Sequence, residues 1–208
     1  MDPSKWIDVT VDKNHYSLDH FVIPKHYEQD LSSILIPHGV IMDRVQKLAR
    51  LIVDQNDGPL GGYQYASDLV NCIKKLTTAS GHTVPISMEF IRVKSYENDQ
   101  SVGVNISLTE NELKDFEGKN ILIVEDIIDT GKTMVALLER LQQYKPKTTK
   151  VTSLLVKKTD RSNGYIPHYV GFAIPDAFVV GYALDYNEHF RDLDHICVIS
   201  NDCGVRAG

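Results

Sequence analysis

The sequence predicts an α/β domain in which a mostly parallel, twisted sheet is flanked by helices, and three observations support this fold class. Short apolar runs typical of buried strands alternate along the chain with stretches whose apolar residues have helical spacing. One unit, Asn120–Tyr144, joins such a strand, a polar turn and such a helix in direct succession. The 208 residues contain neither an internal repeat nor an interdomain linker, so residues 1–208 are expected to form one domain.

The first part of the chain is expected to supply helices and one strand. A short helix at His26–Ile34 would lie over the core. Val40–Val53 and Tyr63–Leu76 are predicted to be helical, the first because its apolar residues fall on one helical face. Val84–Val93 alternates and predicts a strand with three side chains facing inward, namely Ile86, Met88 and Phe90.

The segment between the two longer helices lacks the residues of a buried strand. Strand and helix alternation requires a strand before Tyr63, yet Asp54–Gly62 is polar and glycine-rich. Two alternatives remain open. Either Leu51–Val53 serves as a stub of strand and shortens the preceding helix, or the sheet lacks one core strand.

The second half of the chain begins with a polar stretch, Ser95–Gly118, which is expected to form a mobile loop because lids and binding loops have this length and composition. Beyond the central unit, strands are predicted at Thr149–Lys157, Phe178–Leu184 and His195–Ser200. Arg161–His168 is expected to be a turn-rich connection.

Composition limits the possible functions. A net charge of −6 argues against a nucleic-acid partner, which requires a basic face. No apolar run approaches the ~20 residues that span a bilayer, so no membrane partner is expected. The N-terminus lacks a signal-peptide pattern, and the three cysteines have no metal-ligand spacing, which favours a reducing compartment. We therefore expect a cytoplasmic protein.

The turn of the central unit predicts a site for a ribose and one phosphate. Its strand runs into Glu125 and Asp126, and Asp129–Thr133 then opens the helix, where N–H groups and the macrodipole favour an anion. Gly131-Lys132-Thr133 suggests a P-loop, but that pattern requires a glycine where Asp126 stands. A P-loop nucleotide hydrolase is therefore disfavoured, and the carboxylates instead suit sugar hydroxyls.

Polar residues also follow the other predicted strands. In open parallel sheets, ligands bind at the carboxyl ends of the strands. Each such residue alone could be a solvated side chain or a surface ion pair worth little. Their joint placement at one edge favours a site, and they are Lys94, Ser95, Tyr96, Lys157, Asp185, Tyr186, Asn187 and Arg191.

Several segments resemble the hypoxanthine-guanine phosphoribosyltransferase family of type I phosphoribosyltransferases. They are Ile36–Gly39, Phe90–Tyr96, Ile121–Met134, Val151–Lys157 and Gly171–Ser200. The resemblance implies the type I phosphoribosyltransferase fold and a role in purine salvage. It implies transfer of the phosphoribosyl group of phosphoribosyl pyrophosphate (PRPP) to hypoxanthine or guanine, giving IMP or GMP plus pyrophosphate, with Mg²⁺ as cofactor. It also implies a homodimer or homotetramer.

The resemblance assigns the ribose-phosphate half of the site to the central unit. Glu125 and Asp126 would hold the ribose hydroxyls, and Asp129–Thr133 would hold the 5-phosphate. Asp129 would also reach purine N7 as the catalytic general acid/base. The implied substrate-binding run comprises Glu125, Asp126, Ile127, Ile128, Asp129, Thr130, Gly131, Lys132 and Thr133.

The resemblance assigns the base and pyrophosphate to later residues. Lys157 would donate to purine O6, and Phe178 would stack on the base. Val179 would meet the edge of the base through its backbone. Arg191 would hold pyrophosphate oxygens bidentately.

Metal binding and closure are further implications of the resemblance. Asp185 would bind Mg²⁺, with Glu125 and Asp126 as further metal-binding carboxylates. Ser95 and Tyr96 would sit on a loop that closes over PRPP and excludes water.

The chain departs from the family at the pyrophosphate loop. The family has a buried strand that runs into Leu-Lys-Gly-Gly, whereas this chain is shorter and has Pro59–Gly62, with Leu60 in place of the lysine. Gly61 is the expected pyrophosphate contact that remains. The alternative function is therefore a catalytically impaired or inactive nucleotide-binding isoform or paralogue that lacks a competent pyrophosphate loop.

Overall fold

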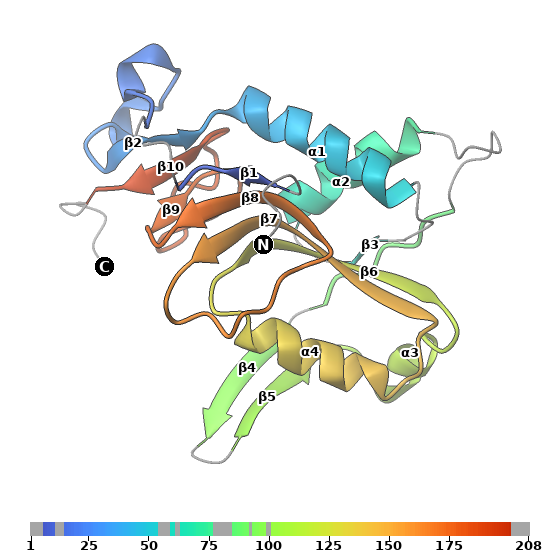
Figure 1. Cartoon of the computed structure of the whole chain (residues 1–208). Coiled ribbons are helices and arrows are strands. Elements are labelled where there is room, and N and C mark those ends of the chain that lie inside the picture. The colour runs from blue at the N-terminus through green and yellow to red at the C-terminus, as the bar shows by residue number, and fades with distance from the viewer. Residues whose placement is uncertain are drawn as a thin grey trace.

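The computed structural model describes residues 6–10, 15–53, 59–60, 63–76, 85–91, 93–98 and 101–200. A parallel five-stranded sheet forms the centre of the fold (Figure 1). Its strands, in spatial order, are β1 (Ile7–Asp8), β8 (Tyr169–Pro175), β7 (Thr148–Lys158), β6 (Asn120–Ile128) and β3 (Pro59–Leu60).

Two smaller sheets contain the other strands found among the described residues. β2 (Leu31–Ile36), β10 (Ile196–Ile199) and β9 (Val179–Val180) form an antiparallel sheet in that order. β4 (Val93–Asn98) and β5 (Ser101–Ile106) form an antiparallel hairpin that projects away from the central sheet in Figure 1.

Helices cover both faces of the central sheet. In Figure 1, α1 (His38–Val53) and α2 (Tyr63–Lys74) lie on one side and α4 (Lys132–Gln142) lies on the other. The short α3 (Glu110–Lys114) starts at a capping box in which Thr109 and Glu112 satisfy each other's backbone N–H groups. Two 3₁₀ turns, Leu18–His20 and Lys25–Tyr27, precede β2. Within the described parts of the chain, no helix has the length and apolarity needed to cross a bilayer.

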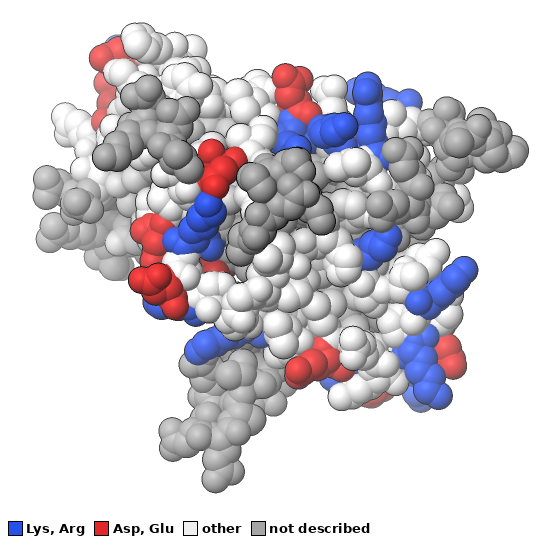
Figure 2. Space-filling model, viewed as in Figure 1, with Lys and Arg blue, Asp and Glu red and all other residues white. Residues whose placement is uncertain are grey.

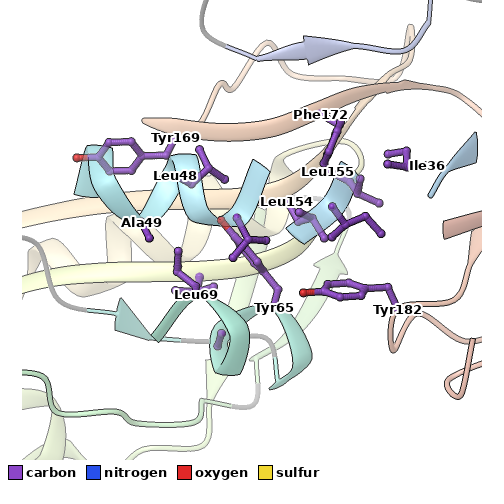
Figure 3. Close-up of a cluster of buried hydrophobic side chains, with 14 of the residues drawn as sticks. Ile36, Leu48, Ala49, Tyr65, Leu69, Leu154, Leu155, Tyr169, Phe172 and Tyr182 are labelled. Atoms are coloured by element: carbon purple, nitrogen blue, oxygen red, sulfur yellow. The ribbon is translucent and has the colours of Figure 1, made fainter. Parts of the chain in front are cut away.

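The apolar faces of these helices produce the two main cores. Figure 3 shows the larger cluster, which joins α1 and α2 to the sheet through residues such as Leu48, Ala49, Tyr65, Leu69, Leu154, Leu155 and Phe172. On the opposite face, Met134, Leu137 and Leu141 of α4 pack against Ile121 and Ile123 of β6. This packing confirms the helical spacing predicted for the central unit and fixes the start of α4 at the end of β6.

The strand pairing at the edge of the sheet beside β6 shows that both alternatives for the missing strand are wrong. α1 continues to Val53, so Leu51–Val53 is helical, and Ile52 and Val53 are buried in the core. Pro59–Leu60 instead pairs in parallel with Leu122–Ile123. A proline is tolerated here because β3 is an edge strand. The sheet therefore has a two-residue strand at this position.

Two expectations for the N-terminal half are wrong. His26–Ile34 is not a helix, because the chain turns at Lys25–Tyr27 and then extends as β2, which buries Leu31 and Ile34. Residues 85–91 do not form the predicted strand, and β4 begins only at Val93. Phe90 is 57% exposed rather than facing inward.

The second half follows the predictions more closely. β7 confirms the strand at Thr149–Lys157, and β10 confirms the strand at His195–Ser200. The strand predicted at Phe178–Leu184 is reduced to β9, because Gly181, Tyr182 and Ala183 adopt positive φ. The expectation of a loop at Ser95–Gly118 is wrong, because this stretch contains most of the β4–β5 hairpin and all of α3. Its mobility stays a prediction.

Candidate active site

Two partly buried carboxylates, Glu125 and Asp126, lie near the carboxyl end of β6. Burial, and then the charge of Asp126, raise the pKa of Glu125 to about 7. Burial raises the pKa of Asp126 to about 6, with the charge of Arg191 acting in the opposite direction. Asp126 Oδ1 is buried, and it has no hydrogen-bond partner among the described residues. A hydroxyl donor or a cation would satisfy this oxygen, so the pair is suited to a sugar or to a metal.

The turn between β6 and α4 is held in one conformation by its sequence. Gly131 caps α4 with φ of 79°, in the left-handed region. A Cβ on Gly131 would collide with Asn163 Oδ1 and approach Tyr165 Cβ to 3.0 Å. The N–H of Asn163 donates to the carbonyl of Thr130 at 2.9 Å, and the N–H of Lys132 donates to Thr130 Oγ1 at 3.4 Å.

A cavity of about 240 Å³ opens beside this turn. Polar lining comes from Glu125, Asp129, Thr130 and Thr133, together with Gly131 at the helix N-terminus. Backbone N–H groups and a helix N-terminus are a favourable setting for a phosphate. The geometry therefore combines acids for hydroxyls with an anion cradle.

Asp129 lines this cavity and lies close to Lys157 of β7. Its Oδ2 lies 3.8 Å from Lys157 Nζ, and its Oδ1 lies 3.2 Å from Arg161 Nη2. The same Arg161 nitrogen lies 3.2 Å from Asp176 Oδ1. The side chain of Asp129 is 41% exposed, so a ligand can reach it.

The segment between β9 and β10 carries the later candidates. Arg191 Nη2 lies 2.8 Å from Asp185 Oδ1, and Arg191 Nη1 donates to the Ala183 carbonyl at 2.8 Å. Positive φ at the non-glycine residues Tyr182, Ala183, Asn187, Glu188 and Phe190 is a concentration of backbone strain of the kind found at functional sites.

Phe178 and Val179 present different surfaces at the start of β9. Phe178 is 50% exposed, with its ring edge-on to Tyr186 at a centroid distance of 5.3 Å. Val179 is buried and pairs with Val198 of β10. An exposed aromatic face is available for stacking, whereas the Val179 side chain belongs to the core.

The predicted site residues fall on a few elements. β6 carries Glu125, Asp126, Ile127 and Ile128; the turn carries Asp129, Thr130 and Gly131; α4 begins with Lys132 and Thr133; and Lys157 is the penultimate residue of β7. The side chains of Ser95 and Tyr96, and the whole of Gly61, lie outside the described part of the chain. Among the residues described, no three or more His, Cys, Asp or Glu side chains gather as a metal-ligating group, so Glu125, Asp126 and Asp185 do not form a joint cage.

The sequence does not predict the residues whose hydrogen bonds hold the elements of the site together. Tyr182 donates to Asp68 Oδ2 of α2 at 2.6 Å, and burial followed by this hydrogen bond raises the pKa of Tyr182. Tyr65 and Thr152 share a buried hydrogen bond of 2.6 Å between α2 and β7. Arg161 and Asn163 are two further residues of this kind, because their segment, Arg161–His168, predicts only a turn-rich connection. None of these side chains has a sequence pattern that points to its partner.

The charges on the face seen in Figure 2 are mixed. Blue and red side chains are interspersed among the described residues of this face, and no broad basic stripe is visible there.

Known proteins match this chain in sequence and in structure. The phosphoribosyl transferase domain family matches residues 59–187. Hypoxanthine-guanine phosphoribosyltransferase of Rattus norvegicus is 54% identical over 200 residues, which is 92% of each chain. The Homo sapiens protein of that name is 52% identical over 205 residues, covering 95% of this chain and 94% of that one.

A solved structure extends this similarity to the fold. Hypoxanthine-guanine phosphoribosyltransferase from Schistosoma mansoni, in complex with IMP, is 37% identical and superposes with a TM-score of 0.77. The match covers 94% of this chain and 95% of that chain. With the β6–α4 cradle and the neighbouring Lys157, these similarities establish that the chain belongs to the hypoxanthine-guanine phosphoribosyltransferase family.

Proposed function

We propose that this protein is a purine-salvage enzyme that transfers the phosphoribosyl group of PRPP to hypoxanthine or guanine, giving IMP or GMP and pyrophosphate. The observation that carries the proposal is the intact cradle at the end of β6, with Asp129 next to Lys157, in a chain whose relatives bear this enzyme name. The IMP complex of the Schistosoma mansoni relative supports a purine nucleotide as the product class.

The ribose-phosphate half of PRPP binds to the β6–α4 unit. Glu125 and Asp126 accept hydrogen bonds from the ribose hydroxyls, for which the buried, unpartnered Asp126 Oδ1 is suited. The 5-phosphate is held by the N–H groups and hydroxyls from Asp129 to Thr133 at the start of α4. These contacts hold the ribose C1 carbon next to Asp129.

Asp129 performs the proton transfer. It accepts the proton from purine N7 as N9 bonds to the ribose C1 carbon and the bond from C1 to pyrophosphate breaks. Lys157, whose ammonium lies near this carboxylate, donates to O6 and selects 6-oxopurines over adenine. Phe178 stacks on the base and Val179 meets its edge through the backbone.

The residues present fit Mg²⁺ carried by the substrate rather than held in a protein cage. Mg²⁺ commonly takes one or two carboxylates plus substrate phosphates and water. Asp185, next to Arg191, would hold the ion near the pyrophosphate, and Glu125 and Asp126 would hold one near the ribose. When bound, Mg²⁺ neutralises the charge that develops on the leaving pyrophosphate.

Closure and assembly belong to the same proposal. The β4–β5 hairpin carries Ser95 and Tyr96 over bound PRPP, and the loop with Gly61 holds pyrophosphate. The enzyme acts in the cytoplasm as a homodimer or homotetramer. The alternative of an inactive nucleotide-binding relative gains no support, because the relatives that match over most of the chain bear the name of this enzyme.

Product formation and calorimetry test the proposal together. The protein with PRPP, Mg²⁺ and either hypoxanthine or guanine should form IMP or GMP, and adenine should give no detectable nucleotide. GMP should bind, and pyrophosphate should bind too when Mg²⁺ is present. If GMP binds but pyrophosphate does not and no product forms, the inactive relative is the correct description.

A further inference from the structure

The hydroxyl of Tyr27 contacts both residues that flank Arg191. It accepts a hydrogen bond from the N–H of Phe190 at 3.0 Å and donates to Asp192 Oδ1 at 2.9 Å. Tyr27 ends the short turn Lys25–Tyr27, just ahead of β2, and β2 pairs with β10, the strand that follows Asp192 (Figure 1). A residue near the start of the chain therefore holds the segment from which Arg191 extends.

The backbone of this segment needs such support at Phe190. This residue has φ of 71°, in the left-handed region, which is unfavourable for a side chain other than glycine and persists only where the surroundings enforce it. The Phe190 ring is fully buried, and its centroid lies 4.3 Å from that of Tyr27. A buried N–H is costly without an acceptor, and the Tyr27 hydroxyl is the acceptor here. Tyr27 therefore stabilises the unusual conformation through both its ring and its hydroxyl.

The Arg191 side chain is 56% exposed, and its guanidinium has two contacts at its far end. Nη2 lies 2.8 Å from Asp185 Oδ1, and Nη1 donates to the Ala183 carbonyl at 2.8 Å. These contacts orient the guanidinium, but they do not fix the backbone at the base of the side chain. Bidentate binding of phosphate oxygens requires a donor fork in a fixed position, so the backbone at Arg191 matters as well.

We infer that Tyr27 is a positioning residue for the reaction: through Phe190 and Asp192 it holds the backbone from which Arg191 reaches the pyrophosphate group. Tyr27 is 6% exposed, so it acts through Arg191 and not by touching the substrate. The inference rests on the pyrophosphate role of Arg191 in the proposed function, and it adds a residue that lies more than 160 positions away in sequence.

Calorimetry with pyrophosphate and Mg²⁺ tests this role on the full-length protein. Tyr27→Phe keeps the ring packed on Phe190 and removes the hydroxyl, so pyrophosphate affinity should fall about 2- to 10-fold. The KM for PRPP should rise by a similar factor. GMP has no pyrophosphate group, so its affinity should stay unchanged. Equal pyrophosphate affinity in Tyr27→Phe and the original protein would overturn the proposal.

Ile34→Val separates positioning from a general loss of stability. Ile34 is fully buried in the same core cluster as Tyr27 and Phe190, and its shortening weakens the packing while leaving the Tyr27 hydroxyl in place. Pyrophosphate affinity should therefore stay unchanged in this variant. A fall as large as that in Tyr27→Phe would mean that any loosening of the cluster has this effect, and the positioning role would be rejected.

A matched pair at Asp192 tests the same role at an exposed position, where substitution does not threaten folding. Asp192→Asn removes the charge but keeps an acceptor oxygen for Tyr27, whereas Asp192→Ala removes both. The alanine variant should bind pyrophosphate about 2- to 5-fold more weakly than the asparagine variant, and equal affinities would contradict the inference. Product formation by the original protein tests the proposed function separately. If no IMP forms but Tyr27→Phe still weakens pyrophosphate binding, the proposed function fails and the role of Tyr27 stands.

Discussion

The guanidinium of Arg161 bridges Asp129 and Asp176. Its Nη2 lies 3.2 Å from an oxygen of each carboxylate. Because Asp176 also accepts a hydrogen bond from Thr159 at 2.8 Å, it provides a fixed anchor from which Arg161 can orient Asp129. The hydrogen bond from Thr159, opposed by some burial and helped by the charge of Arg161, lowers the pKa of Asp176, so this anchor stays ionised at neutral pH.

Arg161→Gln should therefore lower kcat modestly and leave the KM for PRPP nearly unchanged. All three side chains are more than a third exposed, so a change in kcat of no more than about 5-fold is expected. Steady-state rates measure this, with Arg140→Gln as the control, because Arg140 pairs with Glu110 far from the cradle. A loss of several orders of magnitude would mean that Arg161 touches substrate.

Gly131→Ala should destabilise the protein through two separate effects. The left-handed φ of 79° costs about 1–2 kcal/mol for alanine, and the collision with Asn163 adds to this cost. Gly164→Ala is the matched control, because Gly164 has φ of 82° with nothing within 4 Å of a Cβ. Urea unfolding should rank Gly131→Ala as clearly the more destabilised, and equal losses would contradict the proposed collision.

The buried acids predict a pH dependence of stability. The pKa of Glu125 is raised from 4.5 to about 7, and that of Asp126 from 3.8 to about 6, so the folded state binds more protons than the unfolded state between these values. The free energy of unfolding should therefore fall as pH rises from about 4 to 7, by up to roughly 6 kcal/mol from this pair, because one pKa unit corresponds to about 1.4 kcal/mol.

Urea unfolding of the ligand-free protein at pH 5 and pH 7.5 measures this contribution. Glu125→Gln removes one ionisable group without changing the shape of the side chain, and its stability should depend less steeply on pH over the same interval. Identical pH dependence in the variant and the original protein would show that Glu125 ionises normally.

Tyr182→Phe should cost about 1–3 kcal/mol, because it leaves Asp68 without the hydroxyl that donates to it at 2.6 Å. Thermal unfolding tests this against Tyr144→Phe, whose hydroxyl contact with Glu110 is exposed and should matter little. If both substitutions lowered the stability equally, the Tyr182–Asp68 hydrogen bond would not be what stabilises the segment between β9 and β10.

The central unit could be predicted because its information is local. The apolar run of β6, the acids, the turn and the spacing of α4 are contiguous in sequence, and the structure has them in the expected order. β8 was missed because Gly171 and Pro175 look like breaks in an otherwise apolar run. Gly171 in fact allows close approach of strands, since a Cβ there would lie 2.5 Å from the Leu154 carbonyl oxygen.

The supporting contacts of the site could not be predicted because they depend on tertiary proximity. Asn163 reaches Thr130, and Arg161 reaches Asp129, from a connection that follows the next strand. β3 was missed for another reason. A two-residue edge strand needs only its backbone and the neighbouring β6, so the polar, glycine-rich sequence around it carries no strand pattern.

Asp129→Asn tests the central claim most directly, namely that Asp129 transfers the proton beside a ribose-phosphate cradle. The substitution keeps the shape of the side chain and removes its basicity. The rate of IMP formation from hypoxanthine and PRPP with Mg²⁺ should fall by about 10²- to 10⁴-fold, while GMP affinity measured by calorimetry stays within a few-fold of the original. An unchanged rate of IMP formation in the Asp129→Asn protein would contradict the account.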